Sequence, residues 1–332
     1  MNNPITLFTG QWADLPFETM CQKAKDFGYE GLELACWGDH FDVFQGAKDK
    51  AYCDAKKATL KKYGLNVWAI SNHLAGQLIC DPNNDSRSDG FAPANCAGHA
   101  EKKRQYGVDS MKAAARAAKN LGVKVVNGFT GSPIWHMLYS FPPTDWNEIK
   151  KGYQFFADMF NPILDVFDEC GVKFGLEVHP TEIAYDIPTT RKTLEAIKNR
   201  KAFGFNFDPS HLQWQGIEPV KFLQEFSNKI VHVHMKDCVV LLDGSNGILG
   251  SHLNFGEPGR GWEFCSVGRG DVDFEAIVRQ LNKMGYKGPY SVEWEDPFMD
   301  REFGAADAVQ YLKNFIYPVP AGVFDEAFTK KK

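Results

Sequence analysis

The chain has 332 residues, of which 44% are hydrophobic and 24% are charged, and its formal net charge at pH 7 is −5. This length is typical of one α/β barrel, and the hydrophobic fraction is enough for a large core. The mildly acidic charge argues against general binding to nucleic acid or to anionic membranes, because both need a basic surface.

Helices that end in glycine and pass within a few residues into an apolar strand recur along the chain. Glycine just after a helix adopts the left-handed conformation that ends it, so the chain can turn directly into the next strand. The repetition, without an antiparallel hairpin signal, predicts successive βα units and a parallel sheet. The segments are FGYEGLEL from Phe27, YGLNVWAI from Tyr63, LGVKVVNGF from Leu121, CGVKFGLEV from Cys170 and MGYKGPYSVE from Met284.

Eight strands are predicted from short apolar runs. They span residues 5–9, 31–35, 66–71, 124–128, 173–178, 202–208, 229–234 and 290–295. Eight strand and helix pairs predict a closed TIM (β/α)8 barrel of the α/β class, and no GxGxxG or GxxxxGK[ST] motif follows a strand to favour a nucleotide-binding sheet. Long connections follow the third, fourth and seventh strands (72–106, 129–153 and 236–273), and we expect these loops to shape the pocket.

No Ser/Gly/Pro-rich linker divides the chain. We therefore expect one barrel domain over residues 1–318, followed by a C-terminal tail over 319–332. The N-terminal segment does not join a basic stretch to a long apolar one, which leads us to expect a cytoplasmic protein.

Four predicted strands end on residues that bind metal ions: Glu177 in FGLEVHP, Asp208 in FGFNFDPSH, His234 in IVHVHMKD and Glu293 in YSVEWEDP. The carboxyl ends of barrel strands meet at one mouth, so these side chains can surround one ion. Three carboxylates with one imidazole suit Mn²⁺, Mg²⁺ or Co²⁺ better than an all-nitrogen zinc cage, with Zn²⁺ as an alternative. Glu295 shares a side of its strand with Glu293 and is an alternative ligand. The competing interpretation is a set of buried ion pairs between strands.

These motifs resemble the sugar phosphate isomerase/epimerase superfamily of xylose isomerase-like barrels, which includes ketose 3-epimerases, inosose dehydratase and endonuclease IV. The resemblance runs from LFTGQW through the LEVHP, FDPSH, HVHMKD and VEWEDP segments. It implies one divalent ion, with Mn²⁺ the first choice, held by Glu177, Asp208, His234 and Glu293. It also implies that His211, three residues after the aspartate, contacts substrate.

Such a site predicts a reaction at a carbon next to a carbonyl. An ion that binds two adjacent sugar oxygens acidifies the neighbouring C–H and stabilises a cis-enediolate, while two carboxylates on opposite sides carry the proton. By analogy with the epimerases, Glu177 and Glu293 are assigned as the acid/base pair. The other predicted substrate-binding residues are His179, His211, Lys236, Glu295, His73, Trp37 and Arg260.

Several of these assignments have structural alternatives. His232, deeper in its strand than His234, is expected to be a hydrogen-bonded interior histidine. Lys236 and Asp237 can form a local salt bridge, which is the preferred interpretation of Asp237. Trp135 and Trp262 lie in long loops, where an indole can stack on a sugar or simply pack.

The leading functional hypothesis is a metal-dependent isomerase or epimerase of a ketose or related carbohydrate. The alternative is a metal-dependent lyase or dehydratase that acts on a keto-sugar, keto-glycoside or keto-inositol. A phosphodiesterase of the endonuclease IV type is a minor alternative, disfavoured by the acidic charge. The expected partner is a small-molecule carbohydrate, not nucleic acid or membrane. Barrels of this type often associate, so a homo-oligomer is a further expectation, although no sequence feature selects a dimer over a tetramer.

Overall fold

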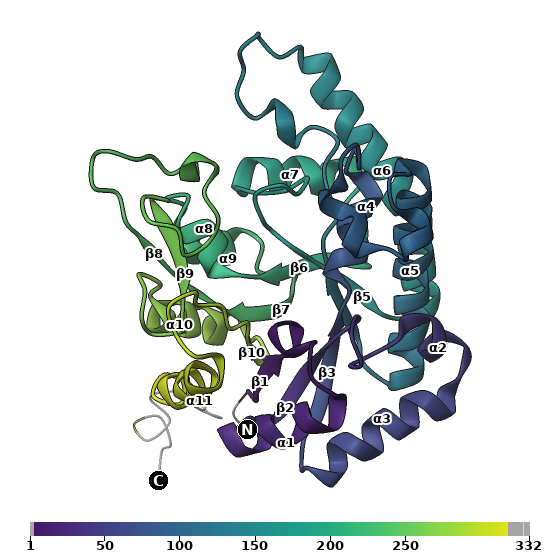
Figure 1. Cartoon of the computed structure of the whole chain (residues 1–332), viewed down its shortest axis with the longest axis vertical. Coiled ribbons are helices and arrows are strands. Elements are labelled where there is room, and N and C mark those ends of the chain that lie inside the picture. Colours follow the sequence, from purple (N-terminus) through teal and green to yellow (C-terminus); the bar gives the residue numbers. More distant parts are fainter. Residues whose placement is uncertain (1–2, 318–327, 329–332) are drawn as a thin grey trace.

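The computed structural model describes residues 3–317 and residue 328. Within these residues, eight parallel strands close into a barrel in the order β1-β10-β7-β6-β5-β4-β3-β2 (Figure 1). All eight predicted strands and the barrel itself are confirmed. The strands are β1 (Ile5–Phe8), β2 (Gly31–Ala35), β3 (Asn66–Ser71), β4 (Val125–Gly128), β5 (Lys173–Glu177), β6 (Phe203–Phe207), β7 (Ile230–Met235) and β10 (Tyr290–Val292). Apart from Phe328, the predicted tail over 319–332 lies outside the described residues.

Helices connect successive strands and cover the outside of the barrel (Figure 1). Their bounds are α1 (Phe17–Phe27), α2 (Val43–Lys48), α3 (Lys50–Lys62), α4 (His73–Cys80), α5 (Ala100–Leu121), α6 (Trp146–Cys170), α7 (Ile187–Ala196), α8 (Pro209–Gln213), α9 (Pro219–Glu225), α10 (Phe274–Met284) and α11 (Arg301–Leu312). Gly28 and Gly122 end α1 and α5 with φ of 96° and 88°, as the glycine pattern predicts. No described helix combines the length and the apolar character needed to span a membrane.

A two-stranded antiparallel sheet lies outside the barrel, and the sequence did not predict it. It consists of β8 (Asp237–Val240) and β9 (Trp262–Cys265), with Asp237 opposite Cys265. Figure 1 shows this sheet in green, at one side of the barrel after β7. The usual hairpin signal is a two-residue turn between alternating runs, whereas here residues 241–261 separate the two strands.

Phenylalanines fill the layer between α6 and the barrel. The rings of Phe160 and Phe167 pack on Phe174 of β5, with centroid distances of 5.4 and 5.8 Å, and Phe156 packs on Phe203 of β6 at 6.1 Å. All five side chains are buried. Each buried phenylalanine contributes about 1.5–3 kcal/mol through the hydrophobic effect, so this layer fixes β5 and β6, which carry much of the site described below.

Candidate metal centre

Four side chains that can bind metal converge at the carboxyl ends of the strands. Glu177 ends β5, Asp208 caps α8 directly after β6, His211 lies in α8, and Glu293 follows β10. One potential ligand atom from each lies within 4.8 Å of every other. Ligands at about 2.0–2.3 Å from an ion lie roughly 3–4.5 Å from one another, so small side-chain adjustments suffice for one ion to bind.

His234 lies at the edge of this cluster. Its Nδ1 is 3.1 Å from a Glu177 oxygen and 3.0 Å from a Glu293 oxygen. The structure therefore brings all four predicted ligands to one place. It also adds His211, which the sequence assigned to substrate, to the compact four-residue group.

The chemistry of Asp208 fits a divalent ion. Its Oδ1 accepts hydrogen bonds from the backbone N–H and hydroxyl of Ser210, at 2.8 and 2.7 Å, but its buried Oδ2 has no hydrogen-bond partner among the described residues. Burial raises the pKa of Asp208 to about 6, although His211 and Lys236 oppose the shift. The nearest nitrogen of a neighbouring histidine, His211 Nε2, lies 3.6 Å from Oδ2, beyond hydrogen-bond distance, so a bound cation would supply a closer positive partner for this buried oxygen.

Glu177 is held as an anion. Burial opposes its ionisation, but His234, His211 and His73 outweigh burial and hold its pKa well below the ordinary value. His211 and His73 each place Nε2 3.1 Å from a carboxylate oxygen, and the Asn206 amide donates to it at 3.0 Å. These contacts fix the orientation of the carboxylate.

Glu293 is also ionised, for a different reason. Burial and the Glu177 charge raise its pKa, whereas Lys236 and His234 lower it, with a net value of about 2. The Lys236 ammonium lies 3.3 Å from Glu293 and 2.9 Å from Glu295, and it sits over the Phe264 ring at 4.1 Å. Lys236 thus forms ion pairs with both Glu293 and Glu295, the two glutamates between which the sequence left the choice of metal ligand open.

The predicted salt bridge between Lys236 and Asp237 is wrong. Neighbouring residues of an extended chain point to opposite sides, so the two side chains face different surroundings. The Asp237 carboxylate instead accepts hydrogen bonds from the backbone N–H groups of Cys238, Gly268, Gly270 and Val272. It organises the turn after β9.

Glu33 of β2 is a buried acidic residue that sequence reasoning missed. Its carboxylate lies 2.7 Å from His232 Nε2 and 3.0 Å from His234 Nε2, and it accepts hydrogen bonds from Ser71, Asn127 and Ser291. These donors come from β3, β4, β7 and β10. The expectation that His232 is an interior, hydrogen-bonded histidine is confirmed.

One sequence feature could have identified Glu33. It is the only charged residue of the otherwise apolar strand GLELA. A charge in a strand buried on both sides needs partners from other strands, and that need marks it as part of a site.

Aromatic rings and histidines surround the cluster. The His179 ring lies 4.1 Å from that of His211 and 5.0 Å from that of Phe129, while the Phe8 ring contacts His73, His234 and Trp37. Burial lowers the pKa of His179 well below its ordinary value, so this imidazole is neutral. His73 and His179 therefore lie beside the cluster, as the substrate-binding prediction requires, whereas Trp37 contacts Phe8 and is separated from the cluster by that ring.

Arg260 lies in the connection between β8 and β9, outside this group. Its guanidinium stacks at 4.0 Å on both Phe255 and Trp262 and donates to the carbonyls of Leu253 and Trp262. Trp262 in turn stacks on Trp214 at 4.2 Å. The contacts of Arg260 thus serve its own loop, and the structure does not bring it to the cluster.

The family model for the xylose isomerase-like TIM barrel matches residues 21–315. The protein YfiH of Bacillus subtilis, described as uncharacterized, is 25% identical over 94% of this chain and 99% of its own length. An inosose dehydratase of Clostridium botulinum strain Eklund 17B is 34% identical, but over 57% of this chain and 60% of that enzyme.

Solved structures that share the fold include the following two. The apo form of 3-keto-D-glucoside 4-epimerase YcjR from E. coli is 15% identical, with a TM-score of 0.64 over 94% of this chain and 99% of that one. The IOLI protein with a bound zinc atom is 18% identical, with a TM-score of 0.60 over 94% and 96% of the two chains. Because the family model covers most of the sequence, this chain belongs to the xylose isomerase-like TIM barrel family.

Proposed function

We propose that this protein is a divalent-metal-dependent isomerase or epimerase that moves a proton at a carbon next to the carbonyl of a carbohydrate. The observation that carries the proposal is the cluster of Glu177, Asp208, His211 and Glu293, in which a buried aspartate oxygen has no hydrogen-bond partner among the described residues. In metal-dependent enzymes of this kind, the ion acts as a Lewis acid toward the carbonyl and stabilises negative charge.

Three carboxylates and a histidine would hold the ion. Glu177, Asp208 and Glu293 supply oxygen atoms, and either His211 or His234 supplies the nitrogen. This mixed set fits Mn²⁺, Mg²⁺, Co²⁺ or Zn²⁺, and we propose Mn²⁺ because oxygen ligands predominate. The zinc atom in the IOLI protein is the experimental precedent for an ion in this fold.

Glu177 and Glu293 are the proposed proton carriers. They come from β5 and β10, which are separated in the barrel by β6 and β7, so the two carboxylates reach the cluster from different sides. Glu177, held by Asn206, His73 and His211, would accept the substrate proton. Glu293, held by Lys236, would pass a proton taken from solvent to the other face of the same carbon. Neutral His179 can hydrogen-bond a substrate hydroxyl.

A lyase is the second candidate, favoured by the inosose dehydratases among the relatives. It begins with the same proton abstraction but then expels a substituent. Lys236, whose buried ammonium touches Glu293 and whose pKa the surrounding carboxylates hold well above its ordinary value, could stabilise the negative charge on the departing oxygen. The same site therefore serves either reaction, and the substrate decides between them.

Incubation in deuterated water separates these candidates. The metal-loaded protein is mixed with free ketoses and with 3-keto-glucosides, and products are followed by NMR and mass spectrometry. Deuterium at an intact, inverted or isomerised carbon supports the proposal, and loss of a substituent supports the lyase. The Glu177→Gln and Glu293→Gln variants, each assayed at a metal concentration that saturates its site, should lose exchange by a factor of about 10² or more. If the metal-loaded protein exchanges no proton with any of these substrates, the proposal is wrong.

A further inference from the structure

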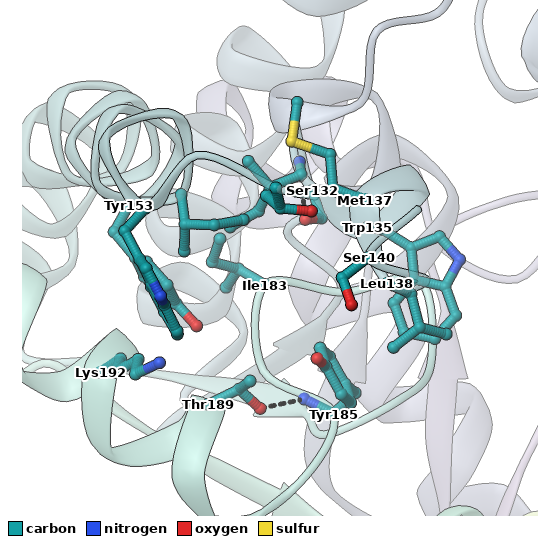
Figure 2. A pocket seen from close by; sticks show the side chains of 14 residues that line it. Ser132, Trp135, Met137, Leu138, Ser140, Tyr153, Ile183, Tyr185, Thr189 and Lys192 are labelled. Carbon is teal, nitrogen blue, oxygen red and sulfur yellow. Dashed lines mark hydrogen bonds between the residues drawn. The ribbon is translucent and has the colours of Figure 1, made fainter. Parts of the chain in front are cut away.

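A cavity of about 330 Å³ opens between the loop that follows β4 and the loop that follows β5 (Figure 2). Ile134 and Trp135 come from the first loop, Ile183 and Tyr185 from the second, and Tyr153 from α6. The labelled side chains in Figure 2 surround this space, with Lys192 and Thr189 of α7 on one side. We refer to it as the aromatic pocket.

The aromatic pocket lies next to the metal centre. Phe129, whose ring contacts those of His73 and His179, is three residues before Ser132, which lines the pocket. On the other wall, the Gln215 side chain donates to the carbonyl of Tyr185 at 3.0 Å and to that of His211 at 2.6 Å. One side chain therefore spans the distance between a pocket wall and the metal cluster.

The buried carboxyl group of Glu182 links the two loops that form the pocket walls. Glu182 of the β5 loop accepts hydrogen bonds from the backbone N–H groups of Thr130 and Gly131 in the β4 loop, at 2.6 and 2.7 Å. Glu182 is fully buried. The pocket is thus preformed, which lowers the entropic cost of binding a ligand there.

The lining identifies the chemical class of the occupant. Among the described residues that line the aromatic pocket, none is Asp, Glu, Asn, Gln or Arg, and Lys192 is the single side chain that carries a positive charge. A neighbouring cavity of about 460 Å³ shares Ser132 and Trp135 but is polar, with Asp81, Asn84 and Arg87 in its walls. Aromatic walls can bind either a sugar face or an aromatic ring, but the lack of carboxylate, amide and guanidinium groups for sugar hydroxyls in the described lining favours the aromatic ring.

We propose that the aromatic pocket binds an aromatic group attached to the sugar at the metal centre. The substrate is then an aryl glycoside rather than a free monosaccharide, with its aglycone packed against the wall formed by Trp135 and Tyr185 and any acidic substituent toward Lys192. The Trp135 and Tyr185 rings already meet edge to face at 5.0 Å. The inference rests on the proposed function, because only a carbohydrate at the metal centre can place its aglycone here.

Binding tests this proposal without turnover. The affinities of 4-nitrophenyl and methyl glucopyranosides, as α and β anomers, are measured by calorimetry on the metal-loaded protein. The aryl glycoside of at least one anomer should bind about tenfold tighter than its methyl counterpart, as expected for ring stacking and burial. Trp135→Ala should abolish that preference and Trp135→Phe should retain most of it. Tyr139→Ala, on the same loop but 81% exposed and outside the lining, should leave it unchanged.

Equal affinity of aryl and methyl glycosides, no measurable aryl binding at millimolar concentration, or a preference that survives Trp135→Ala overturns the proposal. Melting curves of each variant show whether it is folded. Failure of the pocket and failure of the proposed function remain distinguishable. If free ketoses exchange protons in deuterated water but aryl glycosides bind no tighter than methyl glycosides, only the proposal for the aromatic pocket is wrong. If aryl glycosides bind tighter but no substrate exchanges a proton, only the proposed reaction is wrong.

Discussion

Replacing Glu33 with glutamine tests whether this buried carboxylate positions the metal site. Its Oε1 faces Ser71, Asn127 and His234, while its Oε2 faces His232, His234 and Ser291. An amide keeps the shape but turns one of these oxygens into a donor. Whichever orientation the amide takes, at least two donors lose their acceptor.

The cost follows from the number of lost bonds. A buried donor without an acceptor costs about 1–3 kcal/mol, so two of them predict a loss of roughly 2–6 kcal/mol in the free energy of unfolding. His234 also loses the group that orients it. Loss of such a partner typically lowers metal affinity by about 10–100-fold, or ~1.4–2.7 kcal/mol.

Urea denaturation of the metal-free protein measures the first effect, and competition with a chromophoric chelator measures the second. Glu101→Gln, at a position 85% exposed on α5, is the matched control and should change neither quantity. A double-mutant cycle with His232→Asn should show strong coupling with Glu33→Gln, because the two side chains share a hydrogen bond. A folded Glu33→Gln protein with wild-type stability and wild-type metal affinity would refute the positioning role.

Three further predictions concern other buried acids. Asp208→Asn should abolish stoichiometric metal binding. EDTA should lower the melting temperature of the metal-loaded wild-type protein but not that of the variant, because a bound ion stabilises the folded state. Elemental analysis that still finds one tightly bound ion in the variant would contradict this prediction. Burial and Asp81 raise the pKa of Glu182 from 4.5 to about 8, so its contribution to stability is complete below pH 4.5 and is lost as the pH rises through 8. Glu182→Gln should therefore flatten the fall in unfolding free energy between these limits, and an unchanged pH slope would show that Glu182 does not titrate there. Asp237→Ala leaves the backbone N–H groups of four residues without their acceptor. Two of these bonds, those of Cys238 and Val272, are buried, so the protein should be destabilised by about 2–6 kcal/mol in urea, whereas a change below about 0.5 kcal/mol would show that water replaces the carboxylate.

Local patterns in the sequence determined the barrel and the ends of its strands. Glycine after a helix and a short apolar run are signals that need no distant contact, and together they located all eight barrel strands. Once a strand is located in the sequence, the residue at its carboxyl end is known as well. Since parallel strands end at one mouth, local patterns alone were enough to assign Glu177, Asp208, His234 and Glu293 to one place.

Only the tertiary structure decided which side chains meet inside that mouth. Glu33 of β2 reaches His232 and His234 of β7 across the barrel, because β1 and β10 separate these strands in the sheet, and no spacing in the sequence encodes such a contact. The pairing of β8 with β9 and the aromatic pocket depend in the same way on long loops. Their conformations are set by partners far along the chain, such as Glu182 for the β4 loop, and not by local propensity.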